Sequence, residues 1–83
     1  MTDCKQIAKR YLKTLSPDQI EEISRHPDLT DLEHWILYYT YAKNRLVVNT
    51  CMKLNISERQ FFILLSEALT KLYYILELKT VQF

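Results

Sequence analysis

Residues 54 to 72 read LNISERQFFILLSEALTKL and contain the clearest helix signal in the chain. Ser57 is a favourable N-cap, because its hydroxyl oxygen can accept a hydrogen bond from a free amide of the first turn. Gln60 follows three residues later and completes a capping box, while Ile56 and Phe61 are spaced for a hydrophobic staple. The pattern therefore predicts a long helix that begins at Ser57.

The segment before this helix predicts a second, shorter one. Residues 46 to 54 read LVVNTCMKL and are apolar at helical spacing, with a small residue at Cys51. Asn55 can then supply a tight turn between the two helices. A short helix, a turn and a capped helix form the helix-turn-helix pattern, which we predict over residues 46–72.

Two further capping boxes divide the first half of the chain. Ser16 precedes a proline and has Gln19 three residues on, and Thr30 has Glu33 three residues on. We predict an all-α fold of about five short helices with the helix-turn-helix in the C-terminal half and a long last helix. The expected helices cover residues 3–15, 17 to just before Pro27, 31–44, 46–54 and 57–79. The helix over 31–44 is apolar at Leu32, Trp35, Ile36 and Tyr39, and Asn44 is expected to be its left-handed C-cap.

Composition agrees with one small helical domain. The chain has 83 residues, no glycine and two prolines, whereas β-rich folds need many turn residues. We expect a single domain over 1–83, made of an N-terminal helical pair (1–28) and the helix-turn-helix part (29–79). We expect neither a membrane span nor an export signal, and we expect Cys4 and Cys51 to be free thiols.

Charge is unevenly distributed, although the net charge is only +1. Residues 1–15 carry four basic residues against one acidic residue, and residues 43–59 likewise carry four against one. Residues 16–34 between them carry six acidic residues against one arginine. The helix-turn-helix therefore overlaps a basic segment, although solvated faces of ordinary helices would show the same pattern.

The long last helix has two apolar stripes, which predicts burial on two sides. One is assigned to the core: Phe61, Leu64, Ala68, Leu72 and Ile75. The other is Phe62, Leu65, Leu69, Tyr73 and Leu76. The N-terminal helix could cover this second stripe. We instead predict that it forms a homodimer or partner interface, because large exposed apolar patches mark interfaces.

Signals for catalysis are weak, and we predict no enzyme, no catalytic residue, no metal and no cofactor. His26 and His34 are eight residues apart and do not form a metal-binding pair, and the sequence has no phosphate loop or nucleophile elbow. His34 is expected at the surface or on an apolar face with a bonded nitrogen. Cys51 is expected to serve packing. Tyr38, Tyr39 and Tyr41 beside Lys43 could stack on bases.

The predicted second helix of the motif begins with residues suited to DNA. A recognition helix places its N-terminal residues at base edges, and here these are Ser57, Glu58, Arg59 and Gln60. Arginine can bind guanine and glutamine can bind adenine. Phosphates would be bound by Lys43, Arg45 and Lys53. Phe62, Ile63 and Leu65, however, are apolar where a groove-facing helix is usually polar.

Residues 29 to 72 resemble region 4 of bacterial primary sigma factors. The shared residues are Leu29, Glu33, Ile36, Leu37, Cys51, Leu54, Ile56, Ser57, Ala68, Leu69, Lys71 and Leu72. More closely, the stretch looks like the small sigma-like activators of phage late genes of the ArpU/RinA type. The resemblance implies DNA binding through residues 57–60, with further contacts one turn later at Phe62 and Ile63.

Two functions remain open at this point. The first is a phage or prophage transcription regulator that binds double-stranded DNA as a homodimer in the cytoplasm of the bacterial host. The second is a small phage-encoded module that binds a host protein, such as RNA polymerase or a defence nuclease. Near-neutral charge favours the second function, whereas the capped helix-turn-helix favours the first.

Overall fold

The predicted all-α fold is confirmed by a computed structural model that describes residues 4–78. Within that range the helices are α1 (Cys4–Lys13), α2 (Pro17–Ser24), α3 (Asp31–Leu37), α4 (Val47–Leu54) and α5 (Glu58–Ile75). A π-helical segment, η1 (Tyr38–Ala42), continues α3 directly. No β-strand occurs between residues 4 and 78.

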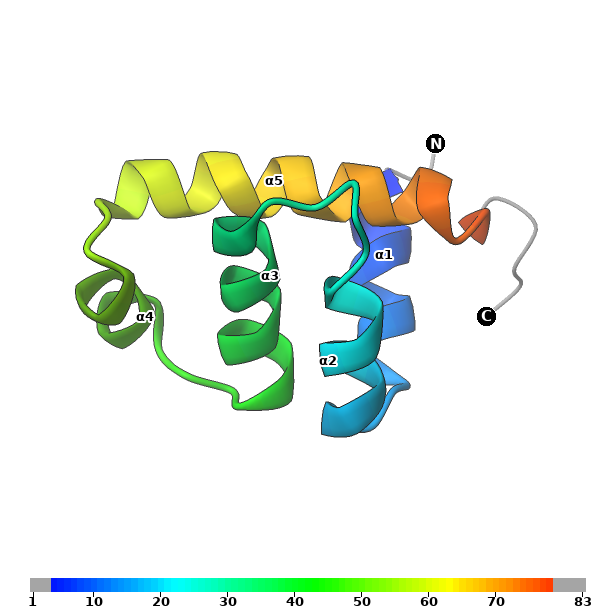
Figure 1. Ribbon diagram of the computed structural model, residues 1–83, viewed down its shortest axis with the longest axis horizontal. Coiled ribbons are helices and arrows are strands. Elements are labelled where there is room, and N and C mark those ends of the chain that lie inside the picture. The colour runs from blue at the N-terminus through cyan, green and yellow to red at the C-terminus, as the bar shows by residue number, and fades with distance from the viewer. Residues whose placement is uncertain (1–3, 79–83) are drawn as a thin grey trace.

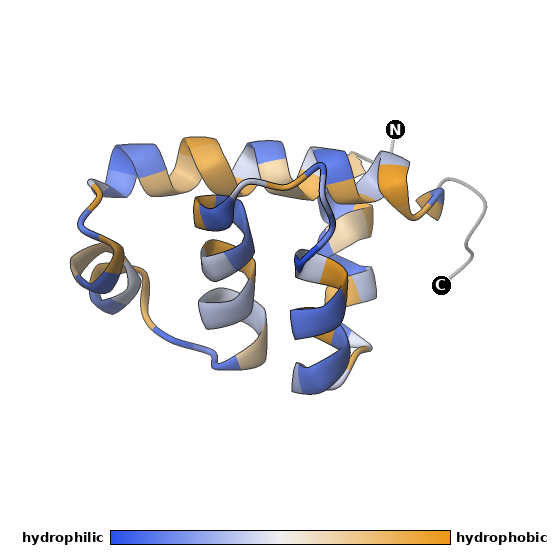
Figure 2. Ribbon diagram, in the orientation of Figure 1, coloured by the Kyte–Doolittle hydropathy of each residue, from blue (hydrophilic) through white to orange (hydrophobic). Residues whose placement is uncertain are grey.

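The long helix α5 lies across the ends of the other helices (Figure 1). α1 and α3 pack against α5, and α2 packs against α3 and η1. α4 lies below the N-terminal end of α5, beside the loop that follows η1 (Figure 1). Hydrophobic and hydrophilic residues alternate along α5, in keeping with a helix that is covered on one side only (Figure 2). The core contains buried apolar residues from all five helices and from η1.

All three predicted capping boxes are present. The N-cap hydroxyls of Ser16, Thr30 and Ser57 accept hydrogen bonds from the backbone N–H three residues on. In each box the Gln or Glu side chain accepts in return from the N-cap N–H, at 2.9 to 3.0 Å. Such boxes satisfy amides that a helix start otherwise leaves free, and the signal is local in the sequence. For this reason the helix starts were predictable.

Helix ends differ more from the prediction. α5 ends at Ile75, before the expected end near residue 79, because the chain turns through Leu76 and Glu77, which has a left-handed φ of 52°. Residue 79 itself lies outside the described residues. α1 ends at Lys13 and α2 at Ser24. Asn44 adopts the expected left-handed conformation, with a φ of 53°. Asn55, which was expected to supply the turn, is also left-handed, with a φ of 57°.

The predicted inner face of α3 was partly wrong. Ile36 is fully buried as expected, but Leu32 and Trp35 are each 38% exposed, and Tyr39 is only half-buried. Glu33, His34 and Leu37 are buried instead. α3 faces the core with Glu33 and His34, because both side chains have hydrogen-bond partners inside the fold.

Two polar contacts account for the burial of His34 and Glu33. The Nδ1 atom of His34 lies 2.7 Å from the Ser24 hydroxyl oxygen, which links α3 to α2. The Glu33 Oε1 atom accepts from the Thr30 N–H at 2.9 Å and from the Lys71 Nζ at 2.8 Å, which links α3 to α5. Buried polar groups are tolerated when they are hydrogen-bonded in this way.

Candidate nucleic-acid interface

The helix-turn-helix predicted over 46–72 is formed by α4, a turn at Asn55 and α5. The Asn55 N–H donates to carbonyl oxygens at the end of α4, and the Ile56 N–H donates to the Cys51 carbonyl at 3.0 Å. These bonds close the C-terminus of α4 in the manner of a left-handed cap. The chain then enters α5 through Ser57, so that the two helices are joined by a short, hydrogen-bonded turn.

Cys51 has the packing role that the sequence predicts. Its side chain is buried in the core on α4, next to the fully buried Thr50. Burial raises the pKa of the Cys51 thiol, and the nearby Glu58 carboxylate raises it further. A thiol held in its protonated form is a poor nucleophile, which agrees with packing.

The four predicted base-reading residues, 57 to 60, are all exposed at the start of α5. Ser57 and Gln60, however, bond to each other in the capping box, where the Gln60 Oε1 accepts from the Ser57 N–H at 3.0 Å. Adenine recognition by glutamine needs the same amide oxygen. Arg59 forms no ion pair with any residue from 4 to 78. Arg59 is therefore the base-reading candidate that the geometry leaves available.

The three predicted phosphate contacts come together over two tyrosine rings. The Lys43 Nζ lies 5.6 Å from the centre of the Tyr38 ring. The Arg45 guanidinium carbon and the Lys53 Nζ lie 5.1 and 5.6 Å from the centre of the Tyr39 ring. We call these five residues the tyrosine-held cluster. All three cations are exposed, and none forms an ion pair with a carboxylate in the described part of the chain.

Trp35 supports this cluster, and sequence reasoning missed it. Its ring stacks on Tyr39 with centroids 5.6 Å apart and meets Tyr38 edge-on at 6.0 Å. Trp35 precedes Tyr38 by three residues and Tyr39 by four, and this spacing places the three rings on one side of a helix. We instead assigned Trp35 to the core, because aromatic residues at helical spacing usually face inward.

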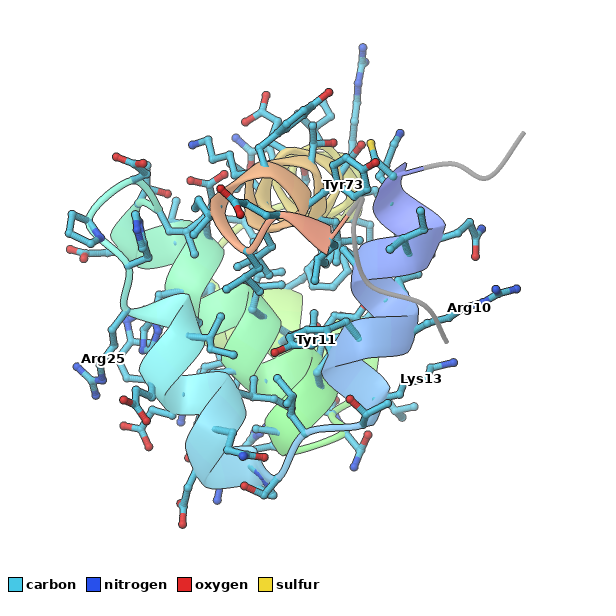
Figure 3. The ribbon with its side chains drawn as sticks, turned by 90° about the vertical axis from the view of Figure 1, so that its right-hand side faces the viewer. Arg10, Tyr11, Lys13, Arg25 and Tyr73 are labelled. Carbon is cyan, nitrogen blue, oxygen red and sulfur yellow. The ribbon has the colours of Figure 1, made fainter. Side chains whose placement is uncertain are left out.

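The predicted interface stripe on α5 is mostly inaccessible. Leu65 and Leu69 are buried, and Tyr73 and Leu76 are partly buried against the core. α1 and α3 both pack against α5, and Leu65 and Leu69 belong to the common core, so the chain itself covers most of this stripe. Tyr73 lies next to α1 in Figure 3. Of the five residues, only Phe62 is exposed, at 54%.

A shallow apolar groove lies between α3 and the start of α5, and the sequence did not predict it. It has a volume of about 280 Å³ and is lined by Leu32, Ile56, Gln60, Ile63 and Leu64. Ile63, predicted as a DNA contact, is 49% exposed at its edge. Phe62 lies beside Ile63 on the exposed surface, where both contribute to a second hollow next to Arg59.

No protein-family model, curated protein or solved structure matches this chain. The resemblance to sigma region 4 therefore rests on the residues quoted above. Among the described helices, none has the length and apolar character to cross a bilayer. Across residues 4–78, no three His, Cys, Asp or Glu side chains gather in a way that could hold a metal ion.

Proposed function

We propose that this chain is a phage or prophage transcription regulator that binds double-stranded DNA through α4 and α5. The observation that carries the proposal is the position of Arg59. It lies exposed in the first turn of a capped helix, directly after a short bonded turn, and has no ion-pair partner among residues 4–78. A recognition helix presents its base-reading residues from this position.

The tyrosine-held cluster also supports the proposal. Lys43 and Arg45 precede α4, and Lys53 lies in its last turn, just before the turn into α5. Cations around the first helix of the motif would contact phosphates while the second helix enters the groove. The chain is nearly neutral overall, so DNA affinity would depend on this local concentration of positive charge.

Selection from a random duplex library tests the proposal. Purified protein is mixed with the library at low salt, and bound duplexes are recovered over several rounds and sequenced. Enrichment of a common sequence that then shifts in a gel is the expected result. If no duplex is retarded at tens of micromolar protein, DNA binding is excluded.

A second candidate function is favoured by the exposed apolar residues at the start of α5. Phe62 and Ile63 are about half-exposed where a groove-facing helix is usually polar, and the apolar groove lies beside them. Buried aromatic and aliphatic anchors dominate protein interfaces. In this alternative the module binds a host protein such as RNA polymerase or a defence nuclease.

A pull-down from host lysate distinguishes this alternative. A stoichiometric host partner that is lost on F62S/I63S, but retained on R59A, would support protein binding. Leu65 and Leu69 are covered within the chain, so Phe62 is the exposed residue of the predicted stripe that a homodimer could still use.

A further inference from the structure

We infer that Tyr39 is a positioning residue that holds Arg45 and Lys53 as a pre-formed binding surface for backbone phosphates. This inference rests on the proposed DNA binding and deepens it, because it names a residue that contacts no DNA but sets the affinity. The three cations were predicted from charge alone, whereas the role of the tyrosine rings follows from the geometry.

Tyr39 is fixed from several directions. Trp35 stacks on its ring at an interplanar angle of 22°, and Tyr38 meets it edge-on at 5.5 Å. The Tyr39 carbonyl accepts a hydrogen bond from the Arg45 N–H at 2.9 Å, which sets the backbone of the loop before α4. The ring is therefore a rigid support, onto which the Arg45 and Lys53 side chains fold from two different segments.

The π-helical segment η1 contributes to this arrangement. The Lys43 N–H donates to the Tyr38 carbonyl at 3.1 Å, across five residues instead of four. Such wide turns are rare and are frequent at functional sites. Here η1 ends at Ala42 with Lys43 as its C-cap, and the chain then leads through Asn44 and Arg45 into α4.

Phosphates fit this surface better than bases do. Two cations already lie over Tyr39, and Trp35 is stacked on it, so little of the ring is left for a base to stack on. The charges, in contrast, remain exposed and unpaired by carboxylates. Glu21, whose carboxylate interacts electrostatically with Lys43, is itself paired with Arg25 at 2.7 Å.

Tyr39 is expected to raise duplex affinity by holding the Arg45 and Lys53 side chains in place before DNA binds. Ordering a long cationic side chain on binding costs conformational entropy, and rigid supports reduce this cost. An exposed cation–π contact is worth about 0.5 to 1 kcal/mol, so the loss of two should weaken duplex binding by at most about 5- to 30-fold. Tyr39→Phe keeps the ring face and should bind as the unmodified protein does.

The test compares the unmodified chain with Y39L, Y39F and the control Y74L, because Tyr74 is exposed on α5, far along the helix from its N-terminus. A short mixed-sequence duplex is titrated at several salt concentrations by fluorescence anisotropy. Y39L should bind less tightly than the other three at every salt concentration. Side-chain protons of Arg45 and Lys53 should be shifted upfield by the Tyr39 ring in nuclear magnetic resonance spectra of the free protein, and Y39L should lose these shifts.

Five results would overturn the inference. Equal duplex affinity of Y39L and the unmodified chain would do so while leaving the proposed function intact, whereas failure of every variant to bind the duplex would remove both. Tighter binding of a single strand of the same sequence would mean that the rings stack on bases, and equal binding of polyglutamate would mean that any polyanion suffices. If Y39L does not fold, absence of the upfield shifts in the unmodified chain overturns the inference by itself.

Discussion

Replacing Lys71 with methionine tests the ion pair that joins α3 to α5. The Lys71 Nζ lies 2.8 Å from the Glu33 Oε1, and the side chains are 39% and 1% exposed, respectively. Burial alone would raise the pKa of Glu33, but the bonds from Lys71 and Thr30 outweigh it, and the pKa lies below its ordinary value. Without Lys71 the ionised carboxylate keeps only its bonds to Thr30, while its Oε2 atom already has no partner.

The expected loss in the free energy of unfolding of K71M depends on how deeply each partner of the ion pair is buried. Removing one partner of a fully buried ion pair costs about 3 to 5 kcal/mol. Lys71 is partly exposed, so water can replace some of the lost interaction, and we expect about 2 to 3 kcal/mol. In a domain of this size the midpoint of thermal unfolding should fall by roughly 10 to 20 °C.

The assay is thermal and urea unfolding followed by circular dichroism. Glu33→Gln keeps an amide oxygen for the capping box and removes the charge. The double variant K71M/E33Q should therefore lose less free energy of unfolding than the sum of the losses in the two single variants. Arg25→Met is the matched control, because its bridge to Glu21 has nearly the same length, 2.7 Å, but an exposed arginine. Equal shifts of the unfolding midpoint in K71M and R25M would refute this reasoning.

Three further predictions follow from single residues. Burial, followed by the charge of Arg25, lowers the pKa of His34 from 6.5, so the unfolded chain takes up a proton at this residue at a higher pH than the folded chain does. The free energy of unfolding should therefore fall as the pH drops below about 6.5 and be constant above it. Urea titrations of the unmodified chain and H34N at several pH values would check this, and equal acid sensitivity of the two would contradict it. Asn55→Ala should cost about 1 to 2 kcal/mol because a Cβ disfavours the left-handed conformation, whereas Asn55→Gly should be tolerated; thermal unfolding of both variants measures the difference. Leu69→Ala should cost about 2 to 5 kcal/mol as a core change, whereas Phe62→Ala should leave stability nearly unchanged; the opposite order in urea unfolding would mean that Leu69 is not buried in the core.

Local chemistry explains which parts of the fold were predictable from the sequence. The boxes at Ser16, Thr30 and Ser57 involve residues three apart, and Asn55 needs only its own backbone conformation. Neither depends on distant parts of the chain. The starts of the helices and the turn of the motif were therefore correctly predicted.

Tertiary contacts explain what was missed. The burial of Glu33 depends on Lys71, which is 38 residues away, and no helical periodicity contains that information. The same holds for Leu65 and Leu69, which are buried in a core built with residues from distant helices that pack against α5. At the candidate site, charge alone predicted Lys43, Arg45 and Lys53, but their common support on Tyr38 and Tyr39 required the path of η1 and the following loop.

Arg59 provides the most direct test of the central claim, that α5 reads DNA bases. Fluorescence anisotropy with a duplex from the library selection would compare the unmodified chain with R59A and R10A. Arg10 is the matched control, because it is an exposed arginine that projects from α1, away from the body of the molecule (Figure 3). R59A should lose about 1 to 3 kcal/mol of binding and its preference at one base pair, while R10A should keep both. Equal affinity and equal base preference in R59A and the unmodified chain would contradict the claim.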